Sequence, residues 1–434
     1  MLPRDRPVSL TNANAAATHG RLSRRALAAS VAAGVLALSV PPIARATAAP
    51  ARAADPGSPL PDVFTPVTVR PLAPTTAPVL GDDSRYHLAY DLWVTNAKAA
   101  PAVINRIEVV NAADPSQVVA VLEGETLNSV VSELSLRPTP DASLAPGASK
   151  LIFVNVAVDD PGRIPAAIAH RVIGAGAANP GATEATPLSY VTAPISLVSL
   201  RPPVIEAPLR GDRWVAGNGP GQSTGAHRSA VQSVNGSLFN AQRFAIDWVR
   251  LDGEDRLVTG DQSVLTNWVD FGEPIHAVAD GAVVSALDGL PDQIPGRLPD
   301  VSSITLETVD GNHVVQEIGG GLYAFYAHMI LGSLAVKAGD RVQAGDVLGR
   351  LGNSGNSSAP HLHLHIMNSP SVLGSDGVPY VYRAFTLTGG LDPARWEAAD
   401  SLEGTWSTTG QSVGAGDYRA ALPQNLHVIN WPAS

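Results

Sequence analysis

Short runs of β-branched and aromatic residues, each ended by Gly, Pro, Asn or Asp, recur along most of this chain and limit the folds it can adopt. "YHLAYDLWVTN", "KLIFVNVAV" and "EPIHAVADGAVVSALDG" are examples. Such runs are typical of β-strands, and D-G, G-N and G-D pairs make tight connections between antiparallel strands. The 434 residues include 40 Gly and 36 Pro but only 5% aromatics, which disfavours long helices. We therefore predict an all-β protein with more than one domain.

Changes in composition divide the chain into segments. Residues 54–80 are rich in Pro, Ala and Thr and are predicted to be a linker. Residues 81–200 have the strand spacing of a β-sandwich, immunoglobulin-like by pattern only. From residue 209 to 390 the turns become denser, which indicates a compact antiparallel β-barrel or sandwich, and residues 391–434 form a C-terminal extension. Within the 209–390 segment, a Pro-rich insertion at 287–300 is either a groove wall or a surface excursion.

The N-terminal 53 residues have the layout of a secretory signal. A basic start precedes an apolar run from Ala26 to Val40, and small residues follow in an A-x-A pattern. The run is too short and too rich in alanine to predict a membrane span, so none is expected after signal removal. An S-R-R-x-L sequence beginning at Ser23 fits twin-arginine export, with a chance arginine pair in an ordinary signal as the alternative. We expect an extracytoplasmic protein of the cell envelope or medium.

The charge balance argues against a nucleic-acid partner. The full chain carries 29 basic and 39 acidic residues, and residues 1–53 hold seven of the basic and one of the acidic residues. The remainder therefore has 29 − 7 = 22 basic and 39 − 1 = 38 acidic side chains, a net charge of −16. Nucleic-acid binders need a basic surface to meet phosphates, so this class of partner is not expected.

The pentapeptide "HLHLH" at 361–365 holds three of the eleven histidines. In a strand, alternation sends the leucines to the core and the histidines to the opposite face, with same-face neighbours about 6.5 to 7 Å apart. Two such imidazoles suit a metal ligand beside a general base better than a shared chelate. A row of polar surface residues is the alternative interpretation.

Two residues elsewhere can complete a metal site. Asp247 lies within the apolar run "FAIDWVRL", and a buried carboxylate is costly unless it is paired with a cation or metal. His328 ends the apolar run "YAFYAH". The chain has no cysteine, so any metal must be held by histidine and carboxylate. A catalytic zinc typically takes three such ligands and leaves a fourth position open.

"FAIDW", "AVADGAVV", "YAFYAHM", "VKAGDRVQAGDVLGRLGNSGNS" and "PHLHLH" occur in that order, and together they resemble the lysostaphin-type (LytM-like) zinc metallopeptidases that cut peptide bonds in bacterial peptidoglycan. The resemblance covers residues 215–385. It implies the duplicated hybrid-motif β-fold, with Asp247 and His363 as zinc ligands and His361 and His328 as catalytic residues.

This chain departs from the family pattern at the position of the first zinc ligand. It usually stands four residues before the aspartate, where this chain has Arg243. The nearest upstream histidine is His227, 247 − 227 = 20 residues away, and an Asn-Gly turn between the two would let the chain return. We predict that His227 replaces the missing ligand. A degenerate site with two ligands is the alternative.

The resulting hypothesis is an exported endopeptidase with one zinc ion per chain, held by His227, Asp247 and His363, that hydrolyses peptidoglycan peptide. One rival is a catalytically degenerate lysostaphin-like domain that acts as a binding or activator module in the cell envelope. A weaker rival is a carrier-type hybrid barrel, suggested by "VKAGDRVQAGDVLGRLG", but that hairpin lacks the lysine that carriers modify. The sequence indicates no oligomeric state and does not identify the bond that is cut.

The other histidines of the β-rich segments receive structural interpretations. His87 and His170 are expected to be packing or surface residues of the sandwich. His276 is expected at a strand edge, facing the groove or the surface, and His313 is expected to be exposed. His365 is interpreted as a residue beside the site or on the surface.

Overall fold

Two antiparallel sheets form the first part of the chain. The computed structural model describes residues 62–179, 181–197, 201–399, 401–408 and 414–432, so the predicted signal segment lies outside the described residues. One sheet has the order β1-β3-β8-β6 with β2 beside β3, and the other has the order β10-β9-β4-β5 with β7 beside β4 and β11 beside β9. The strands are β1 (Val67–Pro71), β2 (Val79–Leu80), β3 (Tyr86–Asn96), β4 (Ala102–Asn111), β5 (Val118–Glu123), β6 (Val131–Glu133), β7 (Ser143–Leu144), β8 (Ser149–Val158), β9 (Ala167–Gly176), β10 (Thr186–Val191) and β11 (Ile195–Ser196).

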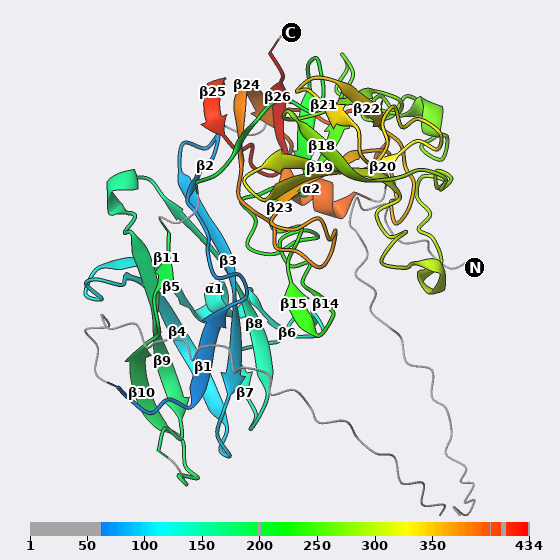
Figure 1. Cartoon of the computed structure of the whole chain (residues 1–434). Helices are drawn as coiled ribbons and strands as arrows, with labels where there is room; N and C mark the ends of the chain where they lie inside the picture. Colours follow the sequence, from blue (N-terminus) through cyan, green and yellow to red (C-terminus); the bar gives the residue numbers. More distant parts are fainter. Residues whose placement is uncertain (1–61, 180, 198–200, 400, 409–413, 433–434) are drawn as a thin grey trace, which may run out of the picture. The chain divides into compact units, whose positions relative to one another are not determined.

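These two sheets share one hydrophobic core. Leu92 and Val94 of β3 and Val154 of β8 are fully buried in it, together with Ile107 and Val109 of β4. Side chains alternate across a strand, and β3 gives this core every second residue from Leu88 to Val94, whereas β8 is covered on both faces and gives it consecutive residues from Leu151 to Val154. The predicted β-sandwich is confirmed (Figure 1).

A large, mostly antiparallel sheet forms the second part. Its order is β12-β24-β26-β13-β16-β23-β20-β19-β18-β21, with β25 beside β24, and two separate two-stranded sheets, β14-β15 and β17-β22, accompany it. The strands are β12 (Val204–Ile205), β13 (Trp214–Gly217), β14 (Gln232–Val234), β15 (Ser237–Phe239), β16 (Ile246–Arg250), β17 (Pro274–His276), β18 (Gly281–Leu287), β19 (Asn312–Gly319), β20 (Leu322–Met329), β21 (Arg341–Val342), β22 (Val347–Arg350), β23 (Leu362–Met367), β24 (Val381–Gly390), β25 (Gly416–Ala421) and β26 (His427–Asn430).

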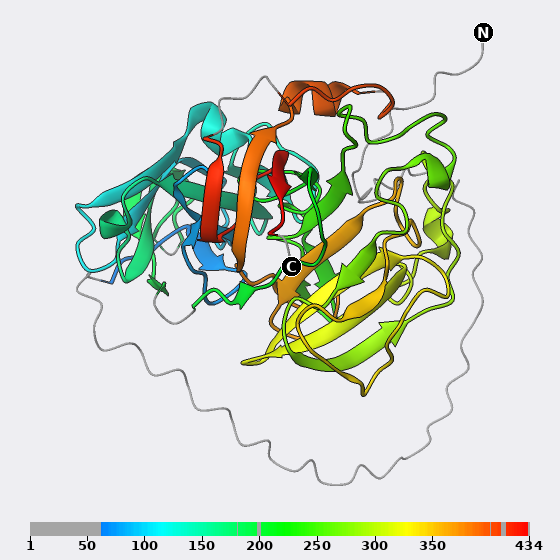
Figure 2. The ribbon, with the colours of Figure 1, turned by 90° about the horizontal axis from the view of Figure 1, so that it is seen from above.

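Strand β26 lies between β24 and β13, so residues from the predicted C-terminal extension are part of this sheet. Figure 2 shows the orange β24 next to the red β25. Trp248 of β16 packs against Tyr382 of β24 and Trp431, with ring centroids 5.9 and 5.1 Å apart. Large aromatic rings thus fill the core on one side of the sheet, beside the strand that carries Asp247.

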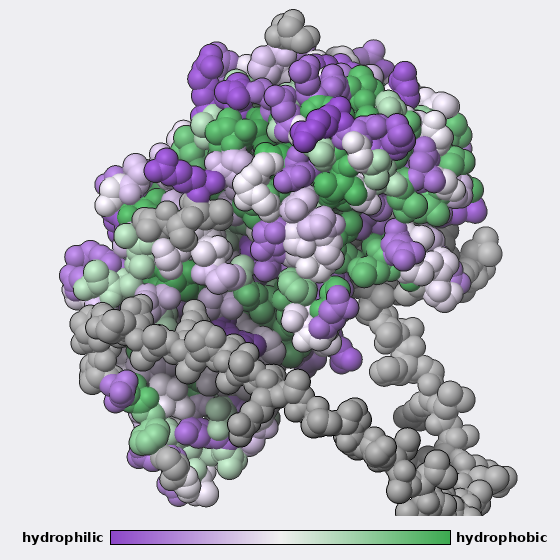
Figure 3. Space-filling model, viewed as in Figure 1, coloured by the Kyte–Doolittle hydropathy of each residue, from purple (hydrophilic) through white to green (hydrophobic). Residues whose placement is uncertain are grey.

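Helices are few in the described residues, which confirms the predicted all-β class. They are α1 (Gly124–Asn128) and α2 (Pro393–Ala398), with 3₁₀ turns at Pro161–Arg163, Leu265–Asn267 and Val301–Ser303. None of the described helices has the length and apolar character needed to cross a membrane. Figure 3 shows hydrophilic and hydrophobic residues interspersed over the visible face of the described chain. Residues from Val63 onward belong to one compact unit.

Candidate metal centre

Three neighbouring strands bring most of the predicted site together. Strand β23 pairs with β16 on one side and with β20 on the other. Asp247 lies directly opposite His363 across the first pair, and Ala327 lies opposite His363 across the second. Residues opposite each other on adjacent strands project to the same face, so the carboxylate and the imidazole meet by register alone.

The carboxylate of Asp247 is surrounded by imidazoles. The Nδ1 atom of His363 lies 2.9 Å from Oδ1 of Asp247, and Nε2 of His361 lies 3.3 Å from the same oxygen. Asn218 donates from its amide to Oδ2 at 2.8 Å. Asp247, His361 and His363 are each no more than 3% exposed.

His227 reaches the same carboxylate from the loop between β13 and β14. Its Nε2 lies 3.4 Å from Oδ2 of Asp247, and its ring stands 4.7 Å from that of His363, edge to face. Its Nδ1 donates to the backbone carbonyls of Asn218 and Ala245, at 3.0 and 3.3 Å, which fixes the direction of the ring. The residue predicted from a position 20 places before Asp247 is therefore in the cluster.

The amide of Asn218 and its backbone carbonyl contact Asp247 and His227 respectively, so this residue braces both. It has a positive φ of 49°, a region in which Asn is one of the few tolerated side chains. Asn218 is the asparagine of "GNGPG" at 217–221, and this turn sequence was the available signal, but sequence reasoning did not identify the residue.

His328 ends β20 in a strained backbone conformation. Its φ is 62°, and the β19–β20 pairing shifts register beside it, between Asn312 and Val314. Bulges of this kind redirect side chains, and strain of this kind is concentrated at functional sites. The ring lies 4.6 Å from that of His361, and its Nδ1 donates to the carbonyl of Ser354 at 2.8 Å.

Burial distinguishes the interpretations of two further histidines. His365 is fully buried, and its Nδ1 lies 2.9 Å from Nε2 of His363, so of its two interpretations the structure selects the position beside the site. The expectation that His313 is exposed was wrong, because it is only 7% exposed and packs its ring on Phe325 at 5.3 Å. Both faces of this part of the sheet are covered, so alternation along the strands does not separate core from solvent here.

Burial controls the protonation of the cluster. It lowers the pKa of His227 to about 4, and it lowers the pKa of His328 well below its ordinary value with help from His361 and His363. Burial alone would raise the pKa of Asp247, but His227 and His361 hold it well below its usual range. Burial thus favours neutral His227 and His328 near the ionised carboxylate. Burial alone would also lower the pKa of His361, but Asp247 outweighs it and raises that pKa above its ordinary value.

The donor atoms suit a metal cation. His227, Asp247 and His363 each offer one ligand atom within 4.8 Å of the others, and so do His328, His361 and His363. The Nε2 atoms of His227, His328 and His361 have no hydrogen bond although they are buried. Ligands about 2.1 Å from a tetrahedral zinc would lie about 3.4 Å apart, which is close to the separations around Asp247.

The Pro-rich insertion lines a hollow of about 220 Å³. Leu290, Pro291 and Gln293 form one side of it, and Gly355 and Asn356, a few residues before His361, form another. The groove-wall interpretation of residues 287–300 agrees with this position.

The fold is all-β, and its large sheet carries a buried cluster of histidine and aspartate side chains that can hold a metal ion. Residues 268–374 match the family model described as "Peptidase family M23". This segment includes His328, His361 and His363 and does not reach Asp247 or His227. Residues 268–374 are therefore similar to the domains of peptidase family M23.

A curated relative is the "Glycyl-glycine endopeptidase ALE-1" of Staphylococcus capitis, 34% identical over 102 residues. The alignment covers 24% of this chain and only 23% of the length of that relative.

Similar solved structures include a mutant catalytic domain of the prophage-encoded M23 protein EnpA from Enterococcus faecalis. It shows 23% identity and a TM-score of 0.23 over 41% of this chain and 93% of that one. The catalytic domain of lysostaphin from Staphylococcus simulans shows 24% identity and a TM-score of 0.21 over 38% and 88%.

Proposed function

We propose that this protein is an exported zinc-dependent endopeptidase that hydrolyses peptide bonds of bacterial peptidoglycan. The observation that carries the proposal is the buried cluster in which His227 and His363 converge on one ionised carboxylate, Asp247. The M23 match supports the peptidase class. The name of the staphylococcal relative supports a glycine-containing peptide as substrate. The basic and apolar N-terminal segment supports export.

We assign one zinc ion to His227, Asp247 and His363. Two histidines and one carboxylate are a catalytic donor set that leaves a fourth position for another ligand. A zinc ion in such a site supplies Lewis-acid polarisation of a carbonyl group and makes water acidic enough to react near neutral pH. His363 would use Nδ1, the nitrogen that faces Asp247, and its Nε2–H would then donate to Nδ1 of His365. A partner of this kind fixes the ring of a ligating histidine.

His361 is assigned as the general base. Its Nδ1 lies 2.8 Å from the carbonyl of Ala359, so this nitrogen carries the proton and donates. In a neutral imidazole the other nitrogen is then an acceptor, and Nε2 is the atom that faces the cluster without a hydrogen bond. That lone pair can take a proton from the attacking water.

His328 is assigned to proton transfer beside His361. Its Nδ1–H donates to Ser354, so its Nε2 is also an acceptor while the ring is neutral. It can donate to the developing oxyanion only after it has gained a proton. The tautomer therefore favours a role in which His328 first shares the proton and then stabilises negative charge.

The test combines metal analysis with digestion of peptidoglycan by the chain lacking residues 1–53. We expect about one equivalent of zinc, and peptide release that a chelator stops and added zinc restores. His363→Ala should lose the metal and the release together, whereas His276→Ala, a half-buried histidine outside the cluster, should keep both.

Zinc retained in full by His363→Ala would contradict the ligand assignment. A wild-type chain that binds no zinc and releases no peptide, yet binds intact wall polymer, would favour the degenerate binding module.

A further inference from the structure

Each of the two chain segments that bring His227 and Asp247 to the cluster carries a buried arginine. Arg228 follows His227 directly, and Arg243 occupies the position four residues before Asp247. Their side chains are 5% and 2% exposed. A buried guanidinium needs an anion and several acceptors, because it can neither lose its proton nor remain unpaired at low cost.

Arg228 finds its partners in the sandwich. Its Nη1 donates to Oδ1 of Asp91 in β3, and its Nη2 donates to the backbone carbonyls of Tyr90 and Val154, at 2.9 and 2.8 Å. Its guanidinium also lies over the ring of Phe153, 5.4 Å from the centroid. The residue next to a candidate zinc ligand is therefore clamped between two strands of the other domain.

Arg243 binds the second oxygen of the same carboxylate. Its Nε and Nη2 lie 2.9 and 2.8 Å from Oδ2 of Asp91. Asn240 donates from its amide to that oxygen at 2.9 Å and to the carbonyl of Arg228 at 3.1 Å, so it joins the two segments. Asp91 is fully buried and accepts from all three residues.

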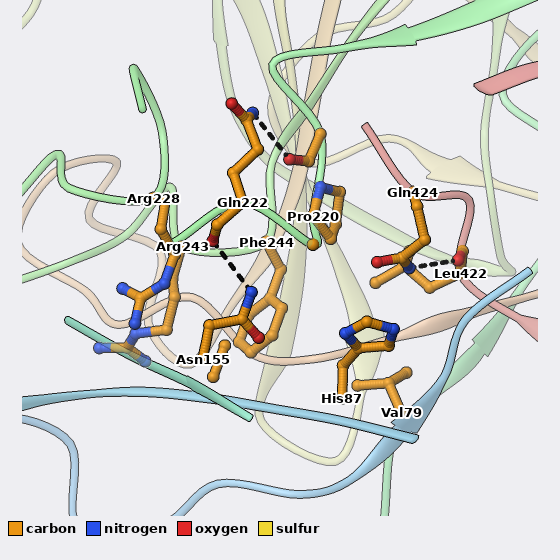
Figure 4. A pocket seen from close by; sticks show the side chains of 13 residues that line it. Val79, His87, Asn155, Pro220, Gln222, Arg228, Arg243, Phe244, Leu422 and Gln424 are labelled. Atoms are coloured by element: carbon orange, nitrogen blue, oxygen red, sulfur yellow. Dashed lines mark hydrogen bonds between the residues drawn. The ribbon is translucent and has the colours of Figure 1, made fainter. Parts of the chain in front are cut away.

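Other contacts bind the same loop to the sandwich. Val231, four residues after His227, belongs to the hydrophobic core of the sandwich. Asn155 of β8 donates to the carbonyl of Gln222 at 3.0 Å. Figure 4 shows this contact, with the guanidinium groups of Arg228 and Arg243 side by side. The loop from residue 218 to 231 is thus held by the sandwich on one side and by Asp247, Ala245 and Asn425 on the other.

We propose that Asp91 of the sandwich is a positioning residue for the metal centre, and that it holds His227 and Asp247 in place through Arg228 and Arg243. The proposal rests on the zinc site assigned under Proposed function. It also accounts for Arg243 at the usual ligand position: the ligand moves to the loop, and the arginine helps to fix that loop. A histidine on a long loop would otherwise lose metal affinity to the entropy of ordering the loop on binding.

Asp91→Asn tests this directly, because it keeps the shape and removes the charge that both arginines share. Zinc affinity is measured by competition with a chromophoric chelator, and cobalt absorption reports the ligand geometry. We expect zinc binding about 10- to 100-fold weaker than in the wild type and an altered cobalt spectrum. Arg228→Lys keeps the charge but loses the forked contact with β3 and β8, and it replaces Asp91→Asn if that variant does not fold.

Glu108→Gln is the matched control. Glu108 is a buried carboxylate of the same sandwich that accepts from Arg106 and Arg171, both in its own sheet. Its loss should lower the stability of the sandwich and leave zinc affinity within about threefold of the wild type.

Equal zinc affinity in wild type and in Asp91→Asn, or in its replacement Arg228→Lys, would overturn the positioning role while leaving the zinc proposal intact. An equal loss in Glu108→Gln would also overturn it, since the effect would then be one of general stability. A wild type that binds no zinc would instead contradict the proposed function itself.

Discussion

Two buried aspartates, Asp91 in the sandwich and Asp247 in the large sheet, are equally hidden from solvent and differ in their partners. Asp91 is met by two arginines and an asparagine amide, and its charge is fully compensated by protein groups. Asp247 is met by three histidines and the amide of Asn218. Burial lowers the pKa of His227 and of His328, whereas Asp247 outweighs burial and raises the pKa of His361, so the second carboxylate is met by imidazoles that can gain or lose a proton and not by permanent charges.

The difference shows how one residue type serves structure in one place and chemistry in another. A permanently charged guanidinium leaves no room for a metal ion at a carboxylate, because it cannot lose its proton and it occupies the carboxylate oxygens. A neutral imidazole leaves a lone pair available, so a carboxylate among imidazoles is ready for a cation. The paired site, at Asp91, should therefore contribute to stability, whereas the open site, at Asp247, should contribute to metal binding and activity.

The largest effect should come from the open site. His361→Gln removes the proposed base and keeps a residue that can accept hydrogen bonds, so peptide release should fall about 10²- to 10⁴-fold while zinc content stays near one equivalent. The measurement pairs a peptidoglycan digestion with metal analysis on the same preparation. Loss of zinc in this variant would show that His361 is a ligand and that the two roles need to be exchanged.

Substitution of each of the two aspartates by asparagine should give the next largest effect, a change in the free energy of unfolding. In chelator-treated protein, Asp91→Asn should lower the free energy of unfolding by about 3 to 5 kcal/mol, because it removes the carboxylate that Arg228 binds and leaves Arg243 only the more distant carboxylate of Asp376, at 3.5 Å. Asp247→Asn should lower it by about 1 kcal/mol or less, since it removes a buried charge along with part of its hydrogen bonding. Urea unfolding at neutral pH checks both. A larger loss for Asp247→Asn would reverse the comparison.

The smallest effect concerns a buried histidine of the sandwich. The ring of His170 shares a hydrogen bond of 2.8 Å with the hydroxyl of Tyr90, and burial lowers its pKa to about 4. Its unfolded pKa is near 6.5, so its contribution to stability is complete above about pH 6.5 and is lost as the pH falls towards 4. Between about pH 6.5 and 5 the wild type should lose about 2 kcal/mol more than His170→Gln. Equal losses in urea unfolding would mean that His170 is protonated in the folded sandwich.

Much of the site was predictable because it depends on local pattern. The alternation in "HLHLH" and the single carboxylate in "FAIDW" both follow from strand geometry, and register across β16 and β23 does the rest. His227 was predicted only through the family resemblance and the Asn-Gly turn, since nothing local distinguishes it from a surface histidine.

Other parts depend on tertiary contacts that sequence spacing does not reveal. Asp91 lies 137 residues from Arg228, and before the fold is known it is one acid among many. The burial of His313 also escaped prediction, because a strand that is covered on both faces has no polar side for alternation to mark.

The position of β26 has a consequence for the order of events in biosynthesis. This strand inserts between β24 and β13, and β13 in turn pairs with β16, the strand that carries Asp247. Until residue 430 has been synthesised, β13 keeps one edge of unpaired backbone groups, and such an edge can pair with another chain. The sheet therefore cannot be completed in step with elongation from the N-terminus. Its closure waits until β26 has been synthesised, so until then the nascent chain carries an unpaired edge on β13, the neighbour of the strand that bears Asp247.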